Sequence, residues 1–61
     1  MGMDKVHVYV DREAQFRWRR VSENGRVVSV SGEGYSTKDH TITMAKDLNP
    51  DTELVDDTVD V

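Results

Sequence analysis

The stretch Phe16-Arg17-Trp18-Arg19 combines basic and aromatic side chains of the kind that bind nucleic acids. Arginines on one face of a sheet can hold phosphates, and aromatic rings can stack on bases. One hypothesis is therefore a nucleic-acid binding module that uses Arg17, Arg19 and Arg26. Two features oppose it: strict alternation would bury Phe16 and Trp18, and an isoelectric point near 4.9 is low for such a domain.

A second candidate site lies around Tyr35 and Lys38, where a helix is expected to start. The first backbone N–H groups of a helix are unpaired and attract anions, so both side chains could contact a small ligand. The alternative role is structural, with the Tyr35 ring fixing the start of the helix on the sheet and its hydroxyl at the rim. We favour the structural role, since Gly32 and Gly34 match neither the dinucleotide nor the Walker spacing.

Few residues of the sequence could form a metal site or a catalytic site. It has no cysteine, which excludes disulfides and thiolate zinc sites. Asp56, Asp57 and Asp60 lack the spacing and glycine of a calcium loop, so we interpret them as a solvated acidic tail. His7 and His40 have no obvious carboxylate or serine partner and are expected to be solvated. We therefore predict no enzymatic activity, no catalytic residue, no metal and no cofactor.

Composition suggests a salty, intracellular setting. The formal net charge is −4, and the acids are eight Asp and four Glu against five Arg and only three Lys. This resembles proteins from salt-loving cells, where high ionic strength screens the repulsion between acids. Neither a membrane-spanning apolar run nor a signal peptide is visible in the sequence, so we predict a halophilic, cytoplasmic protein.

Charge is unevenly spread along the chain. Residues 12–26 hold five arginines and two glutamates, whereas residues 47–61 hold six acids and no base. The two segments are therefore suited to attract one another.

Alternation of residue types predicts three strands in the first half. Val6, Val8 and Val10 alternate with His7 and Tyr9, which indicates a half-buried strand over about residues 5–10. Further strands are expected over about 16–22 and 26–31, joined by a hairpin at the Asn24-Gly25 turn signal.

The second half predicts a helix and a strand. Ser36 and Asp39 approximate a capping box, and Ile42, Ala45 and Leu48, flanked by Thr41 and Met44, form an apolar stripe. The helix should span about 37–48, with Pro50 ending it, and a last strand about 53–59. The result is a single α+β domain over 1–61, an antiparallel β-β-β-α-β unit with one helix packed on the sheet.

The hairpin register depends on loop length. A two-residue loop at Asn24-Gly25 pairs Arg19 with Val30, whereas a three-residue loop from Glu23 to Gly25 pairs Trp18 with Val30. The longer loop gathers the apolar side chains on one face, so burial of these side chains favours it. It also places Gly25 in the left-handed region. Arg20 then lies at the margin of the apolar face with its head in water. The face gathered in this way holds Phe16, Trp18, Val28 and Val30.

Several pieces of the chain together resemble the YegP-like family of prokaryotic domains of unknown function. They are Phe16-Arg17-Trp18-Arg19, Asn24-Gly25, Gly32-Glu33-Gly34-Tyr35-Ser36-Thr37-Lys38, and Ile42 through Asn49-Pro50, spanning roughly Val6 to Thr58. The resemblance implies two such units forming one continuous sheet and exchanging their C-terminal strands. One copy per chain then implies a homodimer. The chain departs from the family in a helix start about one turn shorter and in Thr41, where a glycine is frequent.

Chain length independently favours a homodimer. A domain of about 60 residues buries only about 60% of its unfolded surface and usually needs a disulfide, a metal or a partner. If the last strand is exchanged, the acidic segment would approach the partner's arginine-rich hairpin, and removing residues 53–61 should give an unfolded or monomeric chain. The expected core and dimer residues are Trp18, Val28, Val30, Leu54 and Val55.

The leading hypothesis is thus a non-enzymatic homodimeric domain whose only assigned partner is itself. Two alternatives stay open: nucleic-acid binding, and a small-ligand site at the dimer seam near Tyr35 and Lys38.

Overall fold

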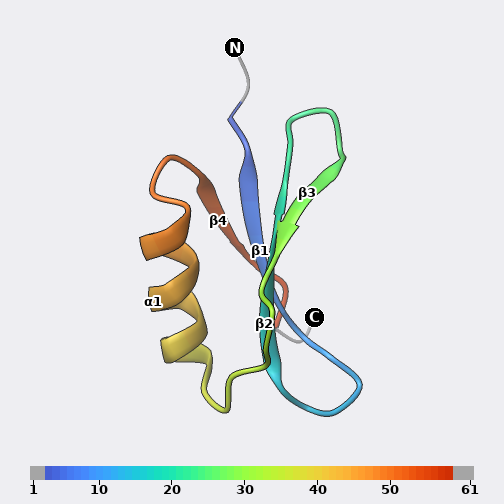
Figure 1. Ribbon diagram of the computed structural model, residues 1–61, viewed down its shortest axis with the longest axis vertical. Helices are drawn as coiled ribbons and strands as arrows, with labels where there is room; N and C mark the ends of the chain where they lie inside the picture. Colours follow the sequence, from blue (N-terminus) through green and yellow to red (C-terminus); the bar gives the residue numbers. More distant parts are fainter. Residues whose placement is uncertain (1–2, 59–61) are drawn as a thin grey trace.

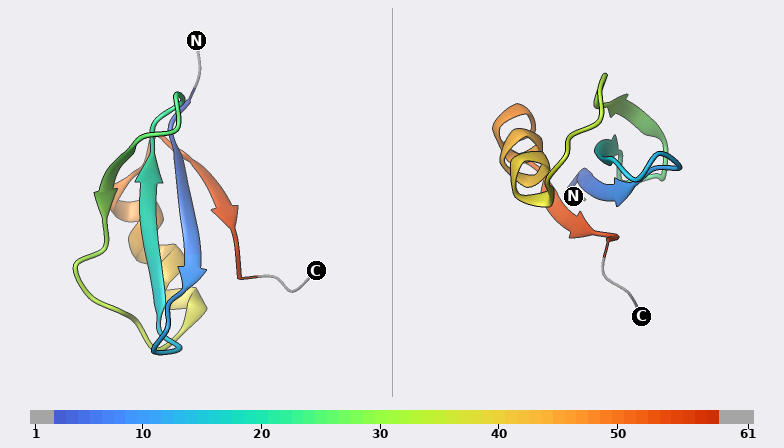
Figure 2. Two further views of the ribbon diagram at one scale, coloured as in Figure 1. Left: turned by 90° about the vertical axis from the view of Figure 1, so that its right-hand side faces the viewer. Right: turned by 90° about the horizontal axis from the view of Figure 1, so that it is seen from below.

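The computed structural model describes residues 3–58, which form a four-stranded sheet with one helix packed on one face (Figures 1 and 2). The α+β class and the order of three strands, a helix and a strand are confirmed. The elements are β1 Lys5–Val10, β2 Phe16–Val21, β3 Val27–Val30, α1 Lys38–Leu48 and β4 Glu53–Asp56. Residue 59, the predicted end of the last strand, lies outside the described residues.

The sheet is mixed rather than wholly antiparallel as expected. Its strand order is β3-β2-β1-β4, in which β2 is antiparallel to both β1 and β3, and β4 is parallel to β1. The reason is the helix between β3 and β4, which returns the chain to the end of the sheet where β3 began. β3 and β4 consequently form the two edges of the sheet, as the left view of Figure 2 shows.

The core lies between the sheet and α1. Val6 and Val8 of β1 are almost fully buried, together with Trp18 and Ala45. Tyr35, Ile42 and Leu54 pack around these four residues. His7, Tyr9, Arg17 and Arg19 alternate with the core residues, so they lie on the opposite face. We call this the open face of the sheet, because α1 packs on the other side (Figure 2).

The β2–β3 turn has the predicted length. Ser22 N–H donates to the Arg26 carbonyl at 2.8 Å, enclosing the three-residue loop from Glu23 to Gly25. Gly25 has a φ of +89°, the left-handed conformation that glycine adopts without strain.

The predicted register beyond this turn is wrong. Val21 pairs with Val27 as the loop requires, but a bulge then shifts the pairing so that Arg20 faces Ser29 and Arg19 faces Val30. The extra residue in the bulge moves the following side chains to the other side of the strand. The face that was expected to bury Val30 therefore receives Ser31 instead.

Val28 and Val30, predicted as core or dimer residues, do not belong to the core of the single chain. Val27, Val28 and Val30 retain 56%, 56% and 55% of their surface. In their place Ser31 is buried, its Oγ accepting from Trp18 N–H at 3.2 Å and its N–H donating to the Trp18 carbonyl at 2.9 Å. A small hydroxyl side chain here satisfies a buried backbone donor that valine would leave unpaired.

The helix start and its N-cap each lie one residue later than predicted. Thr37 rather than Ser36 is the N-cap, with Oγ1 accepting from His40 N–H at 3.3 Å. Thr41 and Ala45 are buried against the sheet.

The predicted apolar stripe fails at its C-terminal end, where Leu48 is 58% exposed. The buried residue in this last turn is Asn49, whose backbone and side-chain N–H groups both donate to the Ala45 carbonyl. Within the described residues, no helix has the length and apolar character needed to cross a membrane.

Candidate functional site

The structure separates the three arginines of the predicted nucleic-acid site. Arg17 and Arg19 project from the open face of β2, whereas Arg26 lies in the β2–β3 hairpin. Arg17 Nε lies 2.5 Å from Asp11 Oδ2, and Arg19 lies over the Tyr9 ring at 4.9 Å from its centroid. The three side chains therefore have different surroundings and do not form one basic cluster.

Arg17 is engaged by the β1–β2 loop. The Asp11 carboxylate that binds it also accepts the backbone N–H groups of Glu13 and Gln15, at 2.8 and 3.0 Å. The hydrogen bond from Arg17, followed by those backbone donors, lowers the pKa of Asp11, and the same carboxylate raises the pKa of Arg17. This contact shapes the loop and leaves the Arg17 guanidinium less available to a phosphate.

Arg19 is exposed and lies opposite His7 on the neighbouring strand. Its contact with Tyr9 is a cation–π arrangement, which keeps the guanidinium over the ring. His7 was expected to be solvated and without a partner, but its Nδ1 lies 2.8 Å from Asp57 Oδ2. This contact joins β1 to the residue that follows β4.

The open face as a whole is nearly balanced in charge. Strand register and alternation place three bases and two acids on it, and the Arg17 partner Asp11 lies beside it. This near balance gives only a weak long-range attraction for a polyanion. The bases are Lys5, Arg17 and Arg19, and the acids on the face are Glu53 and Asp57.

Tyr35 and Lys38 have structural contacts rather than a shared ligand cavity. Tyr35 exchanges two backbone hydrogen bonds with Phe16, at 2.8 and 2.9 Å, and its ring packs on the core. The ring also stacks on His40, with 4.9 Å between the ring centroids, while His40 itself is exposed as expected. Tyr35 therefore fixes the segment before α1 to the end of β2.

Lys38 connects the first turn of α1 to β4. Its Nζ lies 2.5 Å from Asp56 Oδ2. The bond from Lys38, followed by hydrogen bonds from the hydroxyl and backbone N–H of Thr58, lowers the pKa of Asp56 to about 2. Asp56 and Asp57 are consequently bound within the chain rather than forming a solvated acidic tail; Asp60 lies outside the described residues.

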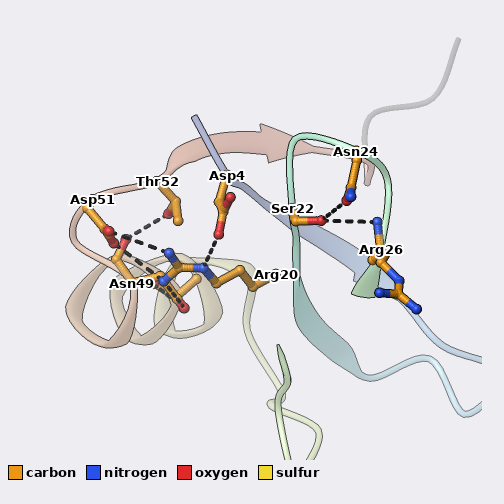
Figure 3. A network of polar contacts seen from close by, with 9 residues as sticks. Asp4, Arg20, Ser22, Asn24, Arg26, Asn49, Asp51 and Thr52 are labelled. Atoms are coloured by element: carbon orange, nitrogen blue, oxygen red, sulfur yellow. Dashed lines mark hydrogen bonds and ion pairs between the residues drawn. The ribbon is translucent and has the colours of Figure 1, made fainter. Parts of the chain in front are cut away.

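Arg20 has a role that the sequence interpretation missed (Figure 3). Its Nε donates to Asp4 Oδ2 at 3.0 Å, and its terminal nitrogens lie 3.4 Å from Asn49 Oδ1 and from the Asp51 carboxylate. One guanidinium thus joins β2 to the residue before β1 and to the α1–β4 connection. Two features of the sequence could have indicated this role: an arginine on the apolar side of a strand, and an acid-rich segment over residues 47–61 that could supply its partners.

One surface cavity lies near the start of β1 and the β2–β3 hairpin. It has a volume of about 390 Å³ and is lined by Met3, Lys5, Val21 and Glu53 among others. Tyr35 and Lys38 do not line it, so the residues predicted for a ligand site are not brought together there. Within residues 3–58, no three His, Asp or Glu side chains are grouped so as to hold a metal ion.

The predicted dimer and core residues divide into two groups. Trp18 is buried and Leu54 packs on the core, whereas Val55 is half-buried on the open face. Val28 and Val30, with Val27, line the outermost strand, and we call these three residues the valine edge. β4 pairs with β1 of the same chain, so the exchange of C-terminal strands between two chains stays a prediction.

Comparison of the chain with family models, curated proteins and solved structures finds no match in any of the three. The resemblance to the YegP-like family therefore rests on the sequence segments quoted above.

Proposed function

We propose that this chain is a non-catalytic domain that works as a homodimer, with β3 of one copy pairing with β3 of another. The observation that carries the proposal is the valine edge. All three valines remain more than half exposed, on a strand whose outer side has no partner among the described strands. An unpaired strand edge presents a row of backbone donors and acceptors, and exposed β-branched residues add an apolar surface to it.

The small core supports the same conclusion. Only four apolar residues are fully buried in the described chain, which is a limited source of stability. A standard interface covers about 800 Å² per partner, roughly a fifth of the 4402 Å² that this chain exposes. A strand of four residues provides less than that alone, so we expect a weak dimer, with a Kd on the order of micromolar.

A second copy is the occupant that suits this edge. A strand edge can pair with itself antiparallel about a two-fold axis, which closes the assembly after two chains. The pairing would cover both valine edges and leave the two β4 edges outermost. Continuous growth through β4 is opposed by the exposed Glu53, because acids on an edge strand repel identical edges.

Sedimentation equilibrium over a range of concentrations tests this proposal. We expect the native chain to show a reversible monomer–dimer equilibrium, and Val30→Lys to stay monomeric at concentrations where the native chain is dimeric. Leu48→Lys is a matched control, since Leu48 is as exposed as Val30 but lies on α1. A native chain that is monomeric at every concentration, or a Val30→Lys dimer as tight as the native one, would refute the proposal.

Nucleic-acid binding is a second candidate, supported by one observation. Arg19 is exposed, lies over Tyr9 and has no acidic partner among the described residues. A titration with single-stranded RNA should then shift the amide resonances of residues 16–21 and weaken as salt rises. Unchanged resonances there would remove this candidate.

A further inference from the structure

We infer that Arg26 and Glu33, which flank β3, form two reciprocal ion pairs across the two-fold axis of the proposed dimer and select antiparallel pairing of its edges. The inference rests on the proposed function and goes beyond it, because it names the residues that determine how the two copies recognise each other.

The first observation is that both residues are exposed and lack an ionic partner within residues 3–58. Two of the three arginines of β2 differ in this respect, whereas Arg19 has only its contact with the Tyr9 ring. Arg17 is bound by Asp11, and Arg20 is bound by Asp4 and Asp51. The valine edge is thus flanked by one unpaired base and one unpaired acid.

The second observation is the placement of Arg26. Its backbone N–H donates to Ser22 Oγ at 3.3 Å and its carbonyl accepts from Ser22 N–H, so the hairpin fixes its backbone. Figure 3 shows its guanidinium extending away from Ser22 and Asn24. Because the Arg26 backbone is fixed and its guanidinium has no ionic partner among the described residues, this side chain is suited to contact a neighbouring molecule.

The positions along β3 complete the argument. Arg26 directly precedes β3, and Glu33 follows its end by three residues. With the two-fold axis at Ser29, antiparallel self-pairing brings the start of one β3 beside the end of the other. It sets each Arg26 opposite the partner's Gly32, where the chain bends away from the strand, and so within about one residue, roughly 3.4 Å, of Glu33. An arginine side chain can span this distance, and the two-fold axis creates the contact twice.

Parallel pairing of the same two edges would have the opposite effect. It would bring Arg26 beside Arg26 and Glu33 beside Glu33, and like charges on adjacent strands are destabilising. The charges that flank the valine edge therefore favour one orientation and oppose the other, as expected of a self-recognition surface.

A charge-swap experiment tests the inference. Arg26→Glu alone and Glu33→Arg alone each replace two attractive contacts of the homodimer by two repulsive ones. We expect each variant to bind itself about tenfold more weakly than the native chain, in buffer of low ionic strength. An equimolar mixture should instead form a heterodimer at close to native affinity, because both of its contacts are attractive again. Native mass spectrometry separates the three species by mass.

The double variant Arg26→Glu/Glu33→Arg provides an independent readout, because it should restore the homodimer that each single change weakens. Asp47→Arg, at an exposed acid on α1, is the control and should show no preference for Arg26→Glu. Circular dichroism establishes that every variant is folded.

The possible outcomes separate the two proposals. The inference would be overturned if the single swaps left dimer affinity unchanged, or if neither the mixture nor the double variant recovered native affinity. The proposed homodimer would stay intact in both cases. A native chain that never dimerises would overturn both.

Discussion

The two edges of the sheet are attached to the rest of the molecule in different ways. β4 is held on several sides: it pairs with β1, Leu54 packs on the core, and Lys38 binds Asp56. β3 is held by β2 alone, and all four of its residues are exposed. The fold therefore secures the acidic edge internally and leaves the apolar edge without a cover.

This difference shows how the charges of the chain are used. Asp51, Asp56 and Asp57 bind Arg20, Lys38 and His7 of the same chain, so the C-terminal acids help to hold β4 in place. The valine edge has no such contacts. The acidic edge, secured in this way, contributes to stability, whereas we propose that the apolar edge serves association.

The largest expected difference between the edges concerns the stability of the monomer. Leu54→Ala removes a side chain packed on the core and should lower the free energy of unfolding by about 2 kcal/mol. Val30→Ala removes an exposed side chain and should change it by less than about 0.5 kcal/mol. Urea unfolding at concentrations far below the dimer Kd measures both values. Equal losses would remove the distinction between the two edges.

A smaller effect is expected at the turn that presents β3. Gly25 has φ +89° and no atom within 4 Å of the position a Cβ would take, so Gly25→Ala introduces backbone strain without a clash. We expect a loss of about 1 kcal/mol in monomer stability, together with weaker dimerisation, because the same turn positions Arg26. An alanine variant as stable as the native chain would show that the turn tolerates another conformation.

The ion pair at β4 predicts a dependence of stability on pH. The pKa of Asp56 is lowered from 3.8 to about 2 in the folded chain, so its contribution is fully present above about pH 4 and is lost as the pH falls toward 2. Asp56→Asn should flatten this part of the curve of unfolding free energy against pH. An Asp56→Asn curve that falls as steeply as the native one would assign the acid sensitivity to other carboxylates. Asp47→Asn, at an acid on α1 outside the described ion pairs, is the matched control.

The smallest effect is expected at the β1–β2 loop, away from both edges. Ala14 has a φ of +61°, a left-handed conformation that is strained for alanine. Ala14→Gly should raise the free energy of unfolding by about 0.5 kcal/mol, since the relief of strain slightly exceeds the entropy cost of glycine. Dimer affinity should not change, which makes this variant a control for general stabilisation.

The order of elements and the hairpin loop were predictable because they depend on local signals. Alternation in residues 6–10, the Asn24-Gly25 turn and Pro50 each act within a few positions of the chain. The register of β3 was not predictable from these signals. A bulge adds one residue without a distinctive sequence, and adjacent Val27 and Val28 fit either face.

The contacts of Arg20 and Ser31 depend on tertiary structure. Arg20 reaches Asp51 across 31 positions of sequence, and Ser31 is selected by a backbone donor of Trp18. Residue alternation alone placed Arg20 at the sheet margin, because Asn49 and Asp51 become its neighbours only when β4 pairs with β1. The site prediction was limited for the same reason, since it treated Arg17, Arg19 and Arg26 as one group.

Cysteine cross-linking is the most direct test of the valine edge as the self-association surface. The native chain has no cysteine, so a single Ser29→Cys change reports on the β3 edge alone. Paired antiparallel strands bring facing Cα atoms to about 4.5–5.5 Å, which is within disulfide range. We predict rapid disulfide-linked dimers for Ser29→Cys under mild oxidation and none for Glu53→Cys on the β4 edge. Equal cross-linking at both positions, or none at Ser29, would contradict the account.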